Sequence, residues 1–251
     1  MELIWWQYLA IVLLGTLAGI INIMAGGGSN LILPVLIMFG IPPDIANGSN
    51  RVGIFLQTIT GIRGFAKARK IPPRRQWQAV LVPTLLGGIA GAVAASVLPN
   101  WILKPTLLLS MLTVATIVLV KPRLFEVQAA SIPQPLRPHS WILLFFIGIY
   151  GGFVQAGVGL LMLPVFAGLL GYDMIRSNAL KLLCTMGFTT AAFLIFIVQG
   201  QIWWGVGIAL AAGNTLGAMI GVRLALKLPV RTVRWLIFVM TLVAVMLAFF
   251  K

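Results

Sequence analysis

AGGGSNLILP, at residues 25–34, is the stretch from which the fold of this chain is best interpreted. It recurs in altered form as AGVGLLMLP at residues 156–164. Three consecutive glycines are unfavourable in the interior of a helix. Inside a membrane, broken backbone is tolerated only where protein or a water-filled cavity covers it. Two breaks at corresponding positions of two halves are typical of a transporter binding site, although close helix packing also selects small residues.

The sequence before each copy follows one pattern, in which an apolar run contains Gly-x-x-x-Gly and then a single amide side chain. After each copy come a short apolar piece, a turn, an aspartate and a run that contains a basic residue. The chain therefore contains two copies of one repeat. The first unit is 1–120, a linker follows at 121–140, and the second unit is 141–251. The residues of the pattern are Gly15, Gly19 and Asn22 before the first copy, and Gly148, Gly152 and Gln155 before the second.

The composition is that of a membrane protein. Of the 251 residues, 60% are hydrophobic and only 9% are charged, which is unlike a soluble domain. Long apolar runs recur from end to end, so we expect an all-α, polytopic membrane protein. No small-residue cleavage site follows the first run, and we expect that run to be retained. The single Cys184 excludes an intrachain disulfide and a cysteine-rich metal site.

Each unit contains five apolar segments. The second segment of each unit contains a proline and is short for a bilayer about 30 Å thick, so we expect it to be kinked, strongly tilted or re-entrant. The fourth segments carry glycines that favour close helix crossing. The segments are 3–24, 29–41, 45–66, 77–97 and 102–120 in the first unit, and 141–157, 159–171, 174–198, 203–226 and 232–250 in the second.

The basic residues predict how the chain crosses the membrane. A net charge of +14 would favour nucleic acid as a partner of a soluble protein, but most of this charge lies in loops, and no nucleic-acid partner is expected. Thirteen of the eighteen basic residues lie at 63–75, in the linker, or at 223–234. The positive-inside rule places these regions in the cytoplasm. The two units then have opposite orientations, which is the architecture of alternating-access carriers.

Three further basic residues, Arg51, Arg176 and Lys181, lie in the third segments, and two of them lie deep inside. Arg51 follows Asp44 by seven residues and Lys181 follows Asp173 by eight, which corresponds to about 10 to 12 Å along a helix. A charge at such a depth costs about 2.5–3.5 kcal/mol and is usually paired or functional. The two aspartates are the carboxylates within reach that could neutralise these cations. If they do not, the interior has excess positive charge and favours an anion.

Uncharged hydrogen-bond donors surround these positions. Helix N-termini at the glycine breaks would add backbone N–H groups and a dipole that favours an anion. We interpret Gln57 and Asn214 as links between helices, a role that the other amides could share. The predicted anion site consists of Arg51, Lys181, Asn22, Gly26, Gly27, Gly28, Ser29, Asn30, Asn47, Asn50, Gln155, Gly157 and Asn178, with Asp44 and Asp173 as coupling or charge-balancing groups.

These motifs resemble the sulfite exporter TauE/SafE family, also called the sulfonate uptake permease family. The resemblance rests on the run from Gly15 through AGGGSNLILP, on ANGSNRVGIF at 46–55, on GGFVQAGVGLLMLP at 151–164 and on SNALKLL at 177–183. It spans both units, and the second copy departs from the first by having Val158 in place of a glycine. The resemblance implies a multi-pass transporter of the bacterial inner membrane for sulfite, sulfonates or related oxyanions.

The expected function is export of such an anion by alternating access, with the anion and the lipid bilayer as partners and with no cofactor or metal ion. The membrane potential favours anion exit by about 2.3 kcal/mol per charge per 100 mV, so a coupled ion is not required. The alternatives are an importer that carries protons on Asp44 or Asp173, and a scaffold without a substrate. An enzyme is disfavoured, because the single histidine, His139, lies in the linker. The glycine faces could serve packing within the molecule or the formation of a homo-oligomer, and the sequence does not distinguish these two uses.

Overall fold

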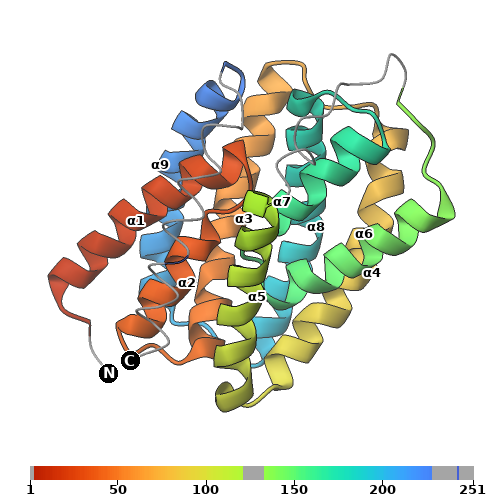
Figure 1. Ribbon diagram of the computed structural model, residues 1–251. Helices are drawn as coiled ribbons and strands as arrows, with labels where there is room; N and C mark the ends of the chain where they lie inside the picture. The colour runs from red at the N-terminus through yellow and green to blue at the C-terminus, as the bar shows by residue number, and fades with distance from the viewer. Residues whose placement is uncertain (1–2, 121–132, 228–241, 243–251) are drawn as a thin grey trace.

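The computed structural model describes residues 3–120, 133–227 and 242. Every regular element in these residues is helical, which confirms the predicted all-α fold. The segment predicted at 232–250, apart from residue 242, and residues 121–132 of the linker lie outside the described residues. The helices of Figure 1 are α1 (Trp5–Met24), α2 (Ser29–Met38), α3 (Pro43–Lys67), α4 (Arg74–Val97), α5 (Asn100–Val120), α6 (Pro138–Phe153), α7 (Val158–Pro164), the π-helix η2 (Val165–Leu169), α8 (Met174–Val198) and α9 (Trp204–Ala225).

The second segment of each unit is short, as predicted. In the first unit it forms α2, which has 10 residues and contains Pro34. In the second unit it is divided into α7, with 7 residues, and η2, with 5 residues. Pro164 ends α7, and because proline has no N–H group to donate, the regular helical hydrogen-bond pattern is interrupted there. At about 1.5 Å per residue, none of these elements spans a bilayer as a straight helix.

Five of the described helices are long and apolar enough to cross a membrane, namely α1, α4, α5, α8 and α9. The 25 residues of α3 would also suffice in length, but its buried side carries polar residues such as Asn47, Asn50 and Arg51. Exposed apolar side chains such as Leu13 and Trp101 cover the outer surface of the helices, as lipid contact requires. The protein is therefore a multi-pass membrane protein.

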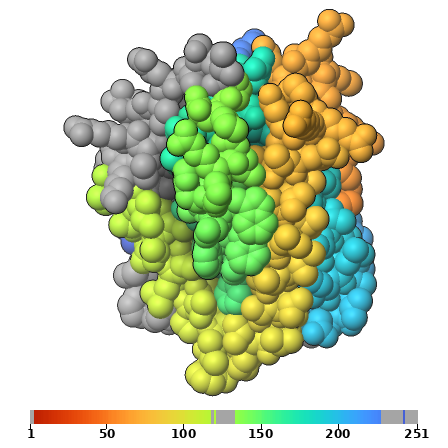
Figure 2. All heavy atoms as spheres, turned by 90° about the vertical axis from the view of Figure 1, so that its right-hand side faces the viewer, coloured from red at the N-terminus to blue at the C-terminus, as the bar shows by residue number. Residues whose placement is uncertain are grey.

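The two units of the repeat are interlocked. α1 of the first unit packs mainly on α9 of the second, and α6 of the second packs mainly on α4 of the first. Figure 2 shows α6, in green, beside α4, in orange and yellow. α3 contacts α9 and α8, and α8 correspondingly contacts α4 and α3. This pattern is unchanged when the units are exchanged, as a repeat requires, while their opposite orientations in the membrane stay a prediction.

Glycines permit the closest of these crossings. A Cβ atom at Gly19 of α1 would lie only 2.6 Å from the carbonyl oxygen of Asn214 on α9. A Cβ atom at Gly152 of α6 would collide with the carbonyl group of Gly88 on α4. The fourth segments therefore do present small-residue faces for close helix crossing, as predicted. These faces are used within the molecule, since α1 and α6 cover them.

Candidate functional site

The two glycine breaks cross each other in the buried interior. A Cβ atom on Gly26, between α1 and α2, would collide with the backbone of Gly159 in α7, and the reverse is also true. Gly26 has a φ of +88° and Gly157 a φ of +75°, a left-handed conformation that glycine adopts without steric cost. Both copies of the motif thus interrupt the helices as predicted, and Val158 does not prevent the second break.

Lys181 of α8 caps the broken end of α1. Its ammonium group donates to the carbonyl oxygens of Asn22 at 2.8 Å and Ile23 at 2.9 Å. A third hydrogen bond of 2.8 Å goes to Oδ1 of Asn178, one turn earlier on α8. The last carbonyl groups of a helix have no partner within it and carry the negative end of its dipole. All three N–H groups of the buried ammonium are therefore used.

Arg51 of α3 caps the broken end of α6 in the same manner. Its Nη1 donates to the carbonyl oxygen of Gly151 at 2.9 Å and to Oε1 of Gln155. Its Nη2 donates to the carbonyl oxygen of Gly152 at 2.6 Å and to Oδ1 of Asn47 at 3.2 Å. The side chain is fully buried, and its Nε has no partner among the described residues. Each unit thus supplies the cation that caps the broken helix of the other.

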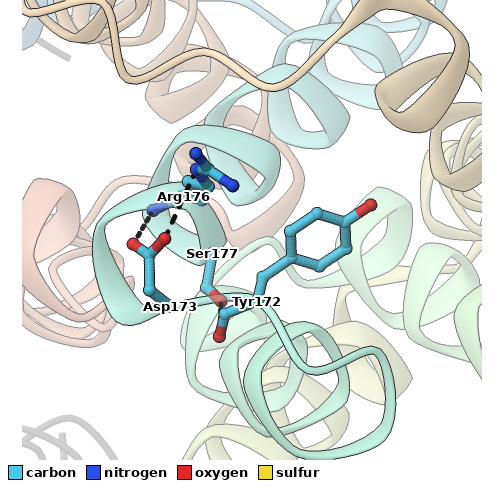
Figure 3. A network of polar contacts seen from close by, with 4 residues as sticks. All are labelled: Tyr172, Asp173, Arg176 and Ser177. Carbon is cyan, nitrogen blue, oxygen red and sulfur yellow. Dashed lines mark hydrogen bonds and ion pairs between the residues drawn. The ribbon is translucent and has the colours of Figure 1, made fainter. Parts of the chain in front are cut away.

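The two aspartates lie away from these cations. Oδ1 of Asp173 accepts a hydrogen bond of 2.9 Å from the backbone N–H of Arg176 and so caps the start of α8. Oδ2 of the same carboxylate lies 3.4 Å from Nε of Arg176 (Figure 3). Asp44 lies in the first turn of α3. In the described part of the chain neither aspartate forms an ion pair with Arg51 or Lys181, whose direct partners are carbonyl and amide oxygens instead.

A small cavity lies where the two breaks meet α3 and α8. Its volume is about 10 Å³, which is about the room that one water molecule needs. Lys181 is the one charged side chain among the described residues that line it. The cavity has to widen before an anion with several oxygen atoms fits. The lining consists of Asn22, Gly26, Gln57, Thr58, Gln155, Val158, Gly159, Lys181, Leu182 and Thr185.

Four residues of the predicted anion site line this cavity: Asn22, Gly26, Gln155 and Lys181. Asn22 also orders the first break, because its Oδ1 accepts a hydrogen bond of 3.1 Å from the backbone N–H of Gly28. Three predicted residues lie behind the lining and contact it or the helix ends through hydrogen bonds. These are Arg51, Asn47 and Asn178.

The other predicted residues are buried near the breaks but do not line the cavity. The side chains of Ser29, Asn30 and Asn50 have no hydrogen-bond partner within the described residues. A Cβ atom at Gly157 would lie 3.2 Å from Oδ1 of Asn30, which places this amide against the second break. The members of this group are Gly27, Gly28, Ser29, Asn30, Asn50 and Gly157.

Three polar residues of the lining are absent from the predicted site, namely Gln57, Thr58 and Thr185. Oε1 of Gln57 accepts a hydrogen bond of 3.3 Å from Nδ2 of Asn22, so this residue links α3 to α1 as predicted and lines the cavity as well. Thr58 follows Arg51 by seven residues and Thr185 follows Lys181 by four. Residues at these spacings share one face of a helix. The spacing from the buried cations is the sequence signal that places both threonines on the same helix faces as those cations.

The lining is suited to binding an anion. An ammonium group together with amide and hydroxyl donors can satisfy the oxygen atoms of an oxyanion, and hydrogen bonds to a charged acceptor are the stronger ones. The described residues contain no group of three or more His, Cys, Asp or Glu residues that could hold a metal ion.

Comparisons with known proteins give one family. A family model described as "Sulfite exporter TauE/SafE" matches residues 11–248. A probable membrane transporter protein, ORF9, of Sinorhizobium sp is 26% identical over 226 residues, which cover 90% of this chain and 86% of that protein. A probable membrane transporter protein of Haemophilus influenzae is 27% identical over 233 residues, with 90% and 88% covered. The probable membrane transporter protein YfcA of Escherichia coli K12 is 26% identical over 227 residues, with 90% and 84% covered.

Proposed function

Because the chain belongs to the sulfite exporter TauE/SafE family of membrane transporters, we propose that it exports a small sulfur-containing anion, such as sulfite or a sulfonate. The proposed membrane is the bacterial inner membrane, and the proposed mechanism is alternating access. The anion would bind in the cavity between the two glycine breaks.

The position of Lys181 is the observation that carries this proposal. Its ammonium group is buried beside the cavity and has only neutral oxygen partners. No carboxylate among the described residues contributes to the lining, so the positive charge there has no carboxylate counter-ion within this part of the chain. A buried charge without a counter-ion is costly, and an anion in the cavity would supply that counter-ion.

The neutral groups of the lining support a small and polar substrate. Amides and hydroxyls from both units converge on the cavity, so the oxygen atoms of one anion would find donors on several sides. The apolar side chains of the lining are Val158 and Leu182. The polar side chains are Asn22, Gln57, Thr58, Gln155, Lys181 and Thr185.

Alternating access is supported by the position of the cavity between interlocked units. The cavity is small in this conformation, and its lining comes from both glycine breaks as well as from α3 and α8. Movement of one unit against the other would change the contact between Gly26 and Gly159 and open the cavity toward one side of the membrane. Such a movement exposes one site to each side in turn.

The positions of the aspartates favour export driven by the membrane potential over the proton-coupled alternative. Asp173 accepts a hydrogen bond from the backbone N–H of Arg176 at the start of α8. Neither Asp44 nor Asp173 lines the cavity. A carboxylate that carries protons together with the substrate is expected to lie within reach of it. An exporter of an anion also needs no coupled ion when the cell interior is negative.

Thermal stability of the purified protein in detergent, measured with added sulfite, sulfoacetate, thiosulfate, taurine or sulfate, tests binding, because a ligand of the folded state alone raises the melting temperature. We expect stabilisation by sulfite or sulfoacetate. Counterflow of the stabilising anion in proteoliposomes at several clamped potentials then tests transport, and we expect the rate to depend on the potential. Absence of stabilisation and of counterflow for all five compounds would favour the scaffold alternative.

A further inference from the structure

We propose that Arg51 is a positioning residue, which holds the amide of Gln155 so that the N–H groups of this amide face the substrate anion. The inference rests on the proposed function, because it concerns the same cavity. It assigns different roles to the two buried cations, although Arg51 and Lys181 occupy equivalent places in the two units. Lys181 would act on the anion through its positive charge beside the cavity, whereas Arg51 would act on it through Gln155.

The hydrogen bonds of Gln155 fix which way its amide points. Nη1 of Arg51 donates to Oε1 of Gln155, and Oγ1 of Thr189 donates to the same oxygen at 3.1 Å. A guanidinium group has no acceptor, so the oxygen and not the nitrogen of the amide must face Arg51. The two N–H groups of Nε2 therefore point away from Arg51. No described residue accepts a hydrogen bond from them, and Gln155 lines the cavity.

The backbone of Gln155 indicates that its side chain is required. Its φ is 67°, in the left-handed region that favours glycine, in addition to the left-handed glycine Gly157 that corresponds to Gly26 of the first break. A residue other than glycine in this region costs of order 1–3 kcal/mol, and such strain gathers at functional sites. A glycine at position 155 would remove the strain but also the amide. The structure thus retains a costly conformation that presents a hydrogen-bond donor to the cavity.

Arg51 itself is held away from the cavity. It is not among the residues of the lining, unlike Lys181. Its Nη atoms are engaged by the carbonyl oxygens of Gly151 and Gly152 at the end of α6. Turning the guanidinium toward the cavity would leave these carbonyl groups without partners in the interior, which is unfavourable. The same hydrogen bonds keep the guanidinium in the place from which it reaches Gln155.

The contact with Arg51 would also strengthen Gln155 as a donor. A cation that donates to the amide oxygen polarises the amide, and hydrogen bonds in a chain reinforce one another in a medium of low dielectric constant. The positive charge of Arg51 would thereby stabilise the bound anion indirectly, through the polarised amide of Gln155. Removal of Arg51 would weaken anion binding only as long as Gln155 is present.

A double-mutant cycle with sulfite as the probe tests this dependence in the full-length protein. The variants are Arg51→Lys, Gln155→Gly and the combination of both, and the dissociation constant of sulfite is measured for each by titration calorimetry. Glycine suits the left-handed backbone at position 155, so Gln155→Gly removes the amide without new strain. We expect each single substitution to weaken sulfite binding roughly tenfold. The double variant should bind no more weakly than Gln155→Gly alone.

Additive losses in the cycle would overturn the inference, because they would show that Arg51 contacts the anion independently of Gln155. If Arg51→Lys does not fold, Thr189→Val tests whether sulfite affinity depends on the position of the Gln155 amide, since Thr189 holds the same amide oxygen; unchanged affinity would then overturn the inference. Gln155→Glu is a further check: its carboxylate can pair with Arg51, so the melting temperature without sulfite should not fall, while sulfite binding should be lost. Unchanged sulfite affinity in Gln155→Gly, together with lost affinity in Lys181→Gln, would overturn the inference and leave the proposed function intact. Unchanged affinity in both would overturn the inference and also reject this cavity as the site of the proposed function.

Discussion

The backbone of Gly26 lies directly against the backbone of Gly159, so that no side chain separates the two glycine breaks. The contact joins the two units of the repeat beside the cavity that Lys181 lines. A rearrangement of either break therefore acts on the other, because the two backbones have no room to move independently. This contact is the place where a relative movement of the units would reach the substrate.

Substitution of Gly26 tests the contact. We expect Gly26→Ala to destabilise the protein strongly, because the new Cβ atom meets the backbone of Gly159 and the φ of +88° is unfavourable for alanine. Gly200→Ala is the matched control, since Gly200 has a φ of +67° with nothing within 4 Å of its Cβ position. The control should cost only about 1–2 kcal/mol from the backbone. Equal melting temperatures of the two variants would contradict the close contact.

A second pair of variants tests how closely α1 and α9 pack where they cross. At Gly15 a Cβ atom would make ordinary contacts of 3.4 Å, whereas at Gly19 it would lie 2.6 Å from the carbonyl oxygen of Asn214. We expect Gly15→Ala to be close to neutral and Gly19→Ala to cost about 1–3 kcal/mol, as overpacking does. The measurement is thermal unfolding of the detergent-solubilised protein. A larger loss at Gly15 than at Gly19 would show that the helices cross at a different place.

Neutralisation of Lys181 should remove anion binding. Lys181→Gln deletes the one charged side chain of the described cavity lining. Loss of the attraction between this charge and the anion should cost on the order of 1.5–3 kcal/mol, so sulfite should bind roughly ten- to a hundredfold more weakly. Arg176→Gln, an exposed cation on the same helix, is the control and should leave the affinity unchanged. The dissociation constant for sulfite is the quantity to compare, and equal losses in the two variants would indicate a general electrostatic effect instead.

The aspartates should not be required for transport. Asparagine caps helices as well as aspartate does, so Asp173→Asn should keep the start of α8 in place. We expect Asp44→Asn and Asp173→Asn to retain anion counterflow at every clamped potential, because neither carboxylate lines the cavity. Proton-driven accumulation that either substitution abolishes would instead support the importer alternative.

The opposite orientations of the two units can be tested by labelling. Lys70 and Gln199 are exposed residues in the connections after α3 and after α8, which are equivalent in the two units. In a Cys184→Ala background, Lys70→Cys should react with a membrane-impermeant maleimide only from the cytoplasmic side, and Gln199→Cys only from outside. Reaction of both from one side would reject the inverted arrangement.

Local sequence features predicted the elements of the fold because their causes are local. The length of each apolar run, the helix-breaking effect of glycine and the rigidity of Pro34 and Pro164 act within a few residues of the chain. The α-helical fold, the short second segments and the small-residue crossing faces could therefore be predicted and are present in the structure. The burial of Arg51 and Lys181 also followed from their positions inside apolar segments.

The partners of the buried cations depended on the tertiary structure alone. Arg51 and the carbonyl oxygen that it binds at Gly151 are 100 residues apart, and Lys181 and its partner at Asn22 are 159 residues apart. A buried cation takes the acceptors that packing brings within about 3 Å, and helical periodicity indicates only which face a side chain occupies. For this reason the sequence left pairing with the aspartates open as one alternative, whereas in the structure the oxygen atoms at helix ends are the partners. Gln57, Thr58 and Thr185 lie around the cavity for the same reason, because the crossing of α3 and α8 at the two glycine breaks determines which side chains meet there.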